Sequence, residues 1–134
     1  MNTIYLASAL ITDENNRLLT VRKKTSTYYM MAGGKLEKDE TPEQALLREL
    51  KEELQITLTL ADLSFLGQHT CEAVNETNTI VTAHIYHIQI HSSQPKASAE
   101  IAEIKWLTQT NYTTVKLARL IAEFSIPIWL KMSN

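Results

Sequence analysis

Cysteine is almost absent from this 134-residue chain, because Cys71 is the only one. A single cysteine cannot form a disulfide within the chain, which excludes a scaffold held together by internal disulfides. A lone thiol with no evident base beside it in the sequence is more often a small buried residue than a nucleophile. We therefore expect a reducing compartment and a cytoplasmic location.

Long hydrophobic stretches and an excess of basic residues are missing as well. No apolar run approaches the ~20 residues of a membrane span, and the stretch 4–11 is too short and too mixed for a signal peptide. The formal net charge of −2 argues against an electrostatic nucleic-acid-binding surface. We expect neither a membrane nor a nucleic-acid partner, whereas a small-molecule substrate and a homodimer both stay open.

Glycine and proline are rare, with three of each, and their positions are informative. Gly33 and Gly34 are adjacent and precede a segment with helical features. Thr41 can be the N-cap of that helix, Pro42 suits its first position, and Gln44 completes a capping box with Thr41. The leucines that follow have helical spacing and form one apolar stripe: Leu46, Leu47, Leu50 and Leu54. These features predict a helix that begins at Pro42.

Three glutamates, Glu49, Glu52 and Glu53, lie together on another face of this predicted helix, because their spacing is i, i+3 and i+4. An acid near a helix C-terminus costs roughly 0.3–1 kcal/mol, and each like-charged pair at this spacing costs about 0.2–0.5 kcal/mol more. A solvated acidic face is the ordinary interpretation of such a pattern. A hard divalent cation held by carboxylate oxygens accounts better for acids that are confined to one end of a helix behind two glycines.

The segment 33–56 resembles the signature of the Nudix hydrolases, written G-x5-E-x7-R-E-U-x-E-E-x-G-U with U aliphatic. The positions that match are Gly34, Glu40, Arg48, Glu49, Leu50, Glu52, Glu53 and Ile56. Only the late glycine departs, because Gln55 stands there. Gln55 would need about 1 kcal/mol or more to adopt the left-handed conformation of that glycine. A match at this many fixed spacings is far more specific than a short glycine motif.

This resemblance implies a fold and a reaction. The Nudix fold is α+β, with a mixed β-sheet sandwiched between helices, and the length of the chain suits one such domain over residues 1–134. The implied reaction is metal-dependent hydrolysis of the diphosphate bond of a nucleoside diphosphate derivative. The cofactor would be Mg²⁺ or Mn²⁺, which lowers the pKa of a bound water and stabilises the developing charge. The expected metal ligands are Glu49, Glu52, Glu53 and, as a further candidate, Glu40.

Further site residues follow from the same resemblance. Arg48 is expected to orient a glutamate by a charge-assisted hydrogen bond. The group that accepts the proton from water is left open among Glu52, Glu53, Glu100 and Glu103. The residues expected to bind substrate are Arg22, Lys35, Gly33 and Gly34. For Arg22, a surface ion pair with an acid is an equally good interpretation.

The remaining sequence predicts strands and helices around this segment. Strands are expected at residues 3–12, 17–24, 29–32, 64–73, 79–90 and 100–107, with a turn-rich loop at 74–78. A terminal helix is expected over residues 115–124, and Pro127 is expected to open a separate short helical piece that ends at Met132. His84 and His87 fall on opposite faces of their strand and therefore cannot hold one metal together.

Two questions stay open at this level. The alternative function is a catalytically silent Nudix-like module that binds a nucleotide and regulates a partner, although such modules usually lose some of the glutamates that this sequence retains. Sequence markers typical of hydrolases of ADP-ribose, dinucleoside polyphosphates or coenzyme A are missing or incomplete. Elimination therefore favours nucleoside triphosphates as substrates.

Overall fold

The computed structural model describes residues 2–73 and 76–132. Its strands form one seven-stranded sheet with the order β3-β2-β1-β6-β5, in which β4 pairs with β1 and β7 pairs with β2. The strands are β1 (Asn2–Thr12), β2 (Leu18–Lys23), β3 (Tyr29–Met30), β4 (Ala32–Lys35), β5 (Ser64–Glu72), β6 (Thr79–Gln89) and β7 (Ile101–Leu107). The sheet is mixed, because β1 and β6 are parallel along their whole length whereas β4 is antiparallel to β1.

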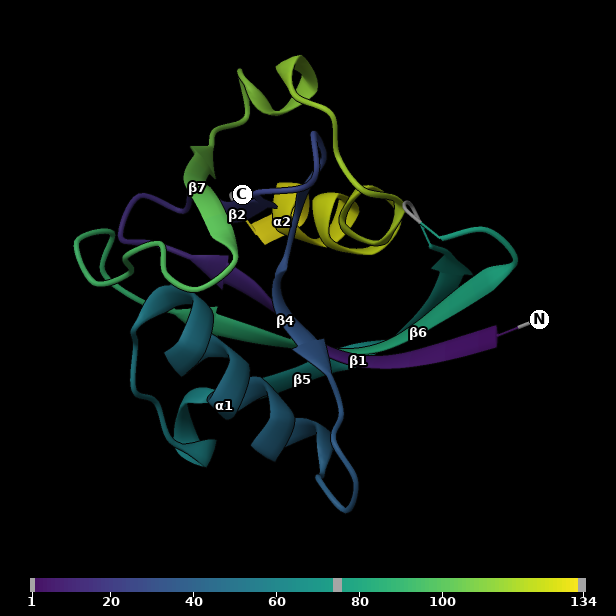
Figure 1. Cartoon of the computed structure of the whole chain (residues 1–134). Coiled ribbons are helices and arrows are strands. Elements are labelled where there is room, and N and C mark those ends of the chain that lie inside the picture. The colour runs from purple at the N-terminus through teal and green to yellow at the C-terminus, as the bar shows by residue number, and fades with distance from the viewer. Residues whose placement is uncertain (1, 74–75, 133–134) are drawn as a thin grey trace.

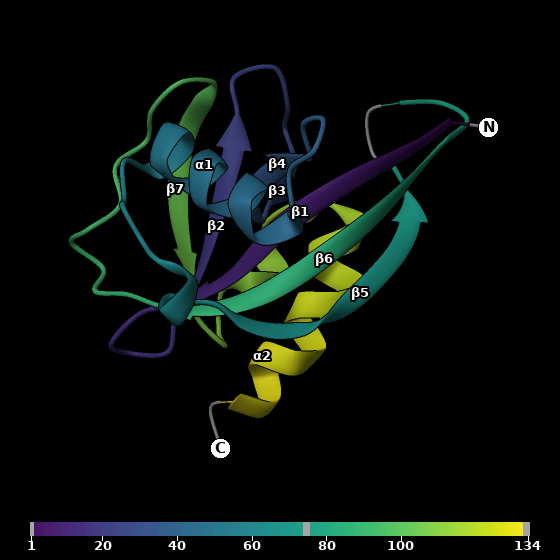
Figure 2. The same cartoon turned by 90° about the horizontal axis from the view of Figure 1, so that it is seen from below.

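Helices cover both faces of this sheet (Figure 1 and Figure 2). Helix α1 (Pro42–Leu54) lies on one face. The C-terminal helical segment, which includes the π-helical turn η3 (Ile121–Ser125) and α2 (Ile126–Met132), lies on the other. Two short 3₁₀ turns, η1 (Leu60–Asp62) and η2 (Tyr112–Thr114), lie in connections. The predicted α+β architecture, a mixed sheet between helices, is confirmed. None of the helices in the described residues is long and apolar enough to cross a membrane.

Helix α1 packs on the sheet through the apolar stripe that its leucine spacing predicts. Leu46, Leu50 and Leu54 are fully buried, as is Ala45, whereas Leu47 is only partly buried. Their partners are apolar residues of β1 and β6 on the same face of the sheet: Ala7, Ala9, Ile11, Tyr86 and Ile88. Burying a leucine side chain contributes roughly 1.5–3 kcal/mol, so this face fixes the helix on the sheet and with it the position of its glutamates.

Both ends of α1 are capped. The hydroxyl of Thr41 accepts a hydrogen bond from the Gln44 amide at 3.1 Å, and the Gln44 side chain accepts one from the Thr41 amide at 3.0 Å. This is the predicted capping box. At the other end Gln55 takes up the left-handed conformation, with φ 57° and ψ 34°, and its N–H donates to the carbonyl of Lys51. Gln55 therefore adopts the backbone conformation that glycine has in the resembled signature, at a conformational cost that glycine does not have.

The start of the C-terminal helix differs from the prediction. Residues 116–118 are extended rather than helical, because they pair with β3. The amide of Tyr29 donates to the carbonyl of Lys116 at 2.7 Å, and the amide of Ala118 donates to the carbonyl of Tyr29 at 2.9 Å. The helix begins at Arg119, four residues later than the predicted start at 115.

Pro127 also lies differently from the prediction, inside a continuous helix rather than at the start of a separate piece. The turn before it is π-helical, and the N–H of Ile126 donates to the carbonyl of Ile121, five residues earlier. Proline has no N–H to donate and would clash in a regular helix interior. A π turn shifts the hydrogen-bond pattern directly before the proline and lets the helix continue.

Two smaller differences concern the segment before α1 and the loop after β5. The predicted strand at residues 29–32 is divided into β3 and β4, and β4 continues through both glycines to Lys35. The predicted loop at residues 74–78 lies partly outside the described residues, since these exclude positions 74 and 75.

Candidate active site

The two glycines of β4 allow α1 to lie directly against the sheet. Gly33 pairs with Ser8, and Gly34 pairs with Ala7. Gly33 has a φ of 140°, and a side chain there would collide with the Ala7 backbone. A Cβ on Gly34 would overlap the carboxylate of Glu49. Gly34 therefore makes the space that the Glu49 side chain occupies, and Gly33 lets β4 lie close to β1.

Glu53 is the buried acid of this site. Glu53 is only 2% exposed, and its Oε1 accepts a hydrogen bond from the Gly33 amide at 3.0 Å. Burial raises the pKa of Glu53 to about 7, and the charges of Glu49 and Glu100 act in the same direction. Burial also raises the pKa of Glu49. Buried acids that repel one another are typical of sites where a bound cation compensates the charge.

Arg48 holds two of the other glutamates. Its Nε and Nη2 donate to both carboxylate oxygens of Glu40 at 2.8 and 2.9 Å, and its Nη1 donates to Oε1 of Glu49 at 2.9 Å. The hydrogen bonds from Arg48 lower the pKa of Glu40 to about 2. Glu52 is more exposed, and its carboxylate lies 3.7 Å from Arg48. Arg48 thus makes the kind of orienting contact that the motif predicts.

The donor set of α1 fits a hard divalent cation. It consists of carboxylate oxygens alone, and the cradle at Gly34 keeps the Glu49 carboxylate close to β4. These oxygens are nevertheless spread out, because Arg48 holds Glu49 and the Gly33 amide holds Glu53. Among residues 2–73 and 76–132, a group of three potential metal-ligand atoms within 4.8 Å of one another lies away from α1. It consists of atoms of His69, Cys71 and Glu123.

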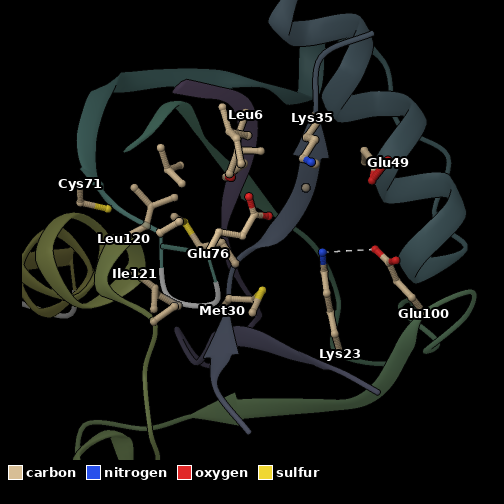
Figure 3. A pocket seen from close by; sticks show the side chains of 18 of the residues that line it. Leu6, Lys23, Met30, Lys35, Glu49, Cys71, Glu76, Glu100, Leu120 and Ile121 are labelled. Atoms are coloured by element: carbon tan, nitrogen blue, oxygen red, sulfur yellow. Dashed lines mark ion pairs between the residues drawn. The ribbon is translucent and has the colours of Figure 1, made fainter. Parts of the chain in front are cut away.

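Of the two acids before and in β7, the structure brings Glu100 to the site. Glu100 lines the pocket next to α1 and forms an ion pair with Lys23 at 3.3 Å (Figure 3). Its charge adds to the raised pKa of Glu49 and of Glu53. Glu103 accepts hydrogen bonds from the Tyr29 hydroxyl at 2.8 Å and from Arg22 Nε at 3.2 Å. These bonds lower the pKa of Glu103. Glu103 therefore links β7 to β2 and β3 through its hydrogen bonds to Arg22 and Tyr29.

Arg22 is not among the residues that line the pocket, whereas its neighbour Lys23 is. Arg22 bonds to Glu103 and donates from Nη1 to the Ser26 carbonyl at 3.1 Å, which is the ion pair that sequence reasoning considered for it. Lys23 lines the pocket and was missed. Adjacent residues of a strand face opposite sides, and the register of β2 against β7 shifts between these two residues. The strand alternation is the signal that could have identified Lys23.

A pocket of about 490 Å³ lies between α1, β4 and the C-terminal helix (Figure 3). Its charged end is formed by Lys23, Gly33, Gly34, Lys35, Arg48, Glu49 and Glu100. Its other end is formed mainly by the apolar residues Leu6, Met30, Val81, Leu120 and Ile121, and the lining there also includes Glu76 (Figure 3). A concave site of this size with a few convergent polar groups is typical of small-molecule binding.

Comparison with known proteins places this geometry in a family. A family model described as the NUDIX domain matches residues 5–124. An 8-oxo-dGTP diphosphatase of Proteus vulgaris is 39% identical over 64 residues, which are 45% of this chain and 57% of that protein. A CTP pyrophosphohydrolase of Escherichia coli (strain K12) is 34% identical over 91 residues, 66% of this chain and 64% of that protein. The chain thus spans less than two thirds of either relative.

Solved structures share the fold. A MutT protein from Methanosarcina mazei Go1 superposes with a TM-score of 0.77 at 21% identity, over 99% of this chain and 96% of that one. The E. coli ORF135 protein superposes with a TM-score of 0.69 at 28% identity, over 96% and 87%. With the family model matching most of its length, this chain belongs to the Nudix family.

Proposed function

We propose that residues 1–134 act as a single Nudix domain that hydrolyses the diphosphate bond of nucleoside diphosphate derivatives, with nucleoside triphosphates as the preferred class. The observation that carries the proposal is one pocket with acids and lysines beside α1 at one end and a mainly apolar hollow at the other, whose lining also includes Glu72 and Glu76. Acids suit a cation, lysines suit phosphate oxygens, and the hollow suits a nucleoside. The printed names of two relatives, an 8-oxo-dGTP diphosphatase and a CTP pyrophosphohydrolase, support a nucleotide substrate.

Glu49, Glu52 and Glu53 would hold the cation, with Mg²⁺ or Mn²⁺ as the proposed ion. Hard cations of this kind prefer carboxylate oxygens. When bound, the ion would neutralise diphosphate oxygens and make water a better nucleophile. Both oxygens of Glu40 are bound to Arg48. In this proposal Glu40 therefore positions Arg48, and Arg48 in turn positions Glu49.

Phosphate oxygens would meet Lys23 and Lys35, which line the charged end of the pocket. Gly33 and Gly34 line the same end of the pocket, and Gly34 leaves room there for the Glu49 carboxylate. Arg22 lies outside the lining, so we assign it to holding Glu103 rather than to contacting substrate. The nucleoside would rest on the apolar residues between β1, β6 and the C-terminal helix.

Glu53 and Glu100 are the proposed proton acceptors. Burial raises the pKa of Glu53 to about 7 in the metal-free protein, and beside a bound cation its carboxylate would be ionised and able to accept a proton. Glu100 lies at the pocket surface beside Lys23, where a water next to a bound phosphate would be within reach. Glu103 fits the role less well, because its hydrogen bonds to Tyr29 and Arg22 favour its ionised form and occupy it.

A substrate panel tests the proposal. The protein is incubated with Mg²⁺ and ribo- and deoxyribonucleoside triphosphates, 8-oxo-dGTP, ADP-ribose or a dinucleoside polyphosphate, and released pyrophosphate, phosphate and monophosphate are measured. We expect pyrophosphate and a nucleoside monophosphate from at least one triphosphate, at a higher rate than any product from ADP-ribose. Calorimetric binding of nucleotides without turnover in Mg²⁺ or Mn²⁺ would support the catalytically silent module instead.

A further inference from the structure

We propose that His69, Cys71 and Glu123 form a zinc-binding site that is separate from the glutamates of α1. An imidazole nitrogen, the thiol sulfur and a carboxylate oxygen of these residues all lie within 4.8 Å of one another. His69 and Cys71 are two residues apart on β5, so both side chains face the same side of the sheet. Glu123 comes from η3, which packs on that side. Three different ligand types from two distant parts of the chain thus meet at one point.

Existing contacts already hold these ligands near one another. Nε2 of His69 and Oε1 of Glu123 are 2.9 Å apart, and the His69 ring packs on Phe124 with a centroid distance of 5.7 Å. The other carboxylate oxygen of Glu123 accepts a hydrogen bond from Nε of Arg119 at 2.9 Å and forms an ion pair with Nη2 of Arg119 at 2.9 Å. Outer partners of this kind orient metal ligands in many sites. Arg119 therefore keeps Oε1 of Glu123 directed at His69.

The chemistry of this donor set distinguishes it from the acids of α1. A thiolate and an imidazole are ligands for Zn²⁺, whereas Mg²⁺ takes oxygen ligands. Zinc lies about 2.3 Å from sulfur and about 2.0–2.2 Å from nitrogen and oxygen, so the three atoms need only small movements to reach one ion. The zinc–sulfur bond would form as the thiol proton leaves to water, with no change in oxidation state. A water molecule would complete the four ligands.

The exposure of two of the three ligands fits the entry of an ion. The side chains of His69 and Glu123 are 29% and 36% exposed, which gives an ion access from solvent, while Cys71 is buried beneath them. Because the metal displaces the thiol proton of Cys71, zinc binding should become tighter as the pH rises.

Occupancy of this site would affect the nucleotide pocket. Cys71 lines the pocket, as do Leu120 and Ile121 of the same helix that carries Glu123 (Figure 3). A zinc ion held by β5 and η3 would tie the edge of the sheet to this helical wall. Its role would be to stabilise the wall, and it requires none of the reaction proposed for α1.

Cobalt is the probe that separates the two sites. Metal-free protein is titrated with Co²⁺ in excess Mg²⁺, and the absorption spectrum is followed. We expect about one equivalent of Co²⁺ to give a thiolate-to-cobalt charge-transfer band, which Zn²⁺ then removes by displacing Co²⁺. Glu52→Gln should keep the band, because carboxylates cannot produce it. His69→Gln and Glu123→Gln should each weaken Co²⁺ binding by at least about tenfold, within the range found when the environment of a metal ligand is disrupted, and Cys71→Ser should abolish the band.

Two outcomes would overturn the proposal. One is a folded wild-type protein, checked by its melting curve, that shows no charge-transfer band at any Co²⁺ concentration below precipitation. The other is an unchanged band and affinity in both His69→Gln and Glu123→Gln, which would mean that Cys71 binds metal without them. Since these two variants change partly exposed side chains, the test does not depend on whether Cys71→Ser folds. Zinc should also raise the melting temperature of the wild type in proportion to the logarithm of its concentration, and at the same zinc concentration it should raise that of His69→Gln and Glu123→Gln by less.

Discussion

The amide of Gly33 donates a 3.0 Å hydrogen bond to the carboxylate of Glu53, and this bond joins β4 to the last turn of α1. The two residues are 20 positions apart and stand near opposite ends of the Nudix signature. The bond favours the ionised form of Glu53, whereas burial favours the neutral form, and burial has the larger effect. Glu53 is thus an acid whose charge the fold accepts only when something compensates it.

Replacing Glu53 with glutamine should abolish most of the activity and leave the fold intact. Glutamine keeps the size of the side chain and an oxygen that can accept the Gly33 hydrogen bond, but it removes the negative charge. We expect kcat to fall at least ~10²-fold, on the order of 2.7 kcal/mol of barrier. Steady-state kinetics measure this. Glu43→Gln, at the first turn of the same helix, is the matched control. Wild-type turnover by Glu53→Gln would remove this residue from the mechanism.

Glu100 and Glu103 should respond differently to the same substitution. Glu100→Gln removes a carboxylate from the pocket and should lower kcat by at least about tenfold, a typical lower range for loss of an acid–base group. Glu103→Gln weakens the hydrogen bonds to Arg22 and Tyr29. Compared with Glu100→Gln, it should lower the melting temperature more and kcat less. Measuring both quantities for both variants decides the assignment. A larger loss of kcat in Glu103→Gln would reverse it.

The contribution of Glu53 to the stability of the metal-free protein should fall as the pH rises from about 4.5 to about 7. Burial raises the pKa of Glu53 from 4.5 to about 7, so in this interval the folded protein binds more protons than the unfolded chain. The contribution of Glu53 to the free energy of unfolding is on the order of 3 kcal/mol. It is fully present below pH 4.5 and is lost above pH 7. Denaturant unfolding in EDTA at several pH values measures it. The Glu53→Gln variant should lack this component, and parallel profiles for the two proteins would contradict the argument.

Local signals predicted α1 almost to the residue, and long-range contacts account for what sequence reasoning missed. The start at Pro42 follows from Thr41 and Gln44, which are neighbours in the chain. The extended segment 116–118 instead depends on Tyr29, whose backbone takes up hydrogen bonds that a helix would have used. The spacing of the leucines in residues 115–124 is helical and gives no indication that residues 116–118 pair with Tyr29.

The site shows the same division between local and distant information. The signature fixed the glutamates of α1, because they share one helix. The approach of Glu100 to them depends on the backbone bond from Lys24 to the Glu100 carbonyl at 3.0 Å and on the ion pair with Lys23. The meeting of Cys71 with Glu123 depends on the packing of the C-terminal helix on β5. Neither contact has a spacing that a single sequence reveals.

Replacing Gln55 with glycine should stabilise the protein by about 1 kcal/mol. Gln55 already has the left-handed conformation, with φ 57°, and glycine adopts it without the steric cost of a Cβ. Glycine also makes the unfolded chain more flexible, which offsets part of the free energy gained by removing the Cβ. Melting curves and denaturant unfolding measure the change. Gln55→Ala is the control and should not stabilise, because alanine retains the Cβ. A destabilised glycine variant would show that the Gln55 side chain stabilises the helix end in another way.

Activity should depend on a hard divalent cation that carboxylates bind. Treatment with EDTA should abolish turnover, and Mg²⁺ or Mn²⁺ should restore it. Ca²⁺ should bind but support turnover poorly, because its longer and more variable coordination places the reacting groups less accurately. Since the acids of α1 repel one another without a cation, Mg²⁺ should also raise the melting temperature with increasing concentration. Glu53→Gln should reduce this increase, whereas Cys71→Ser should leave the Mg²⁺-dependent part unchanged. Full activity after exhaustive chelation would contradict a metal-dependent mechanism and would require another source of charge compensation for Glu49 and Glu53.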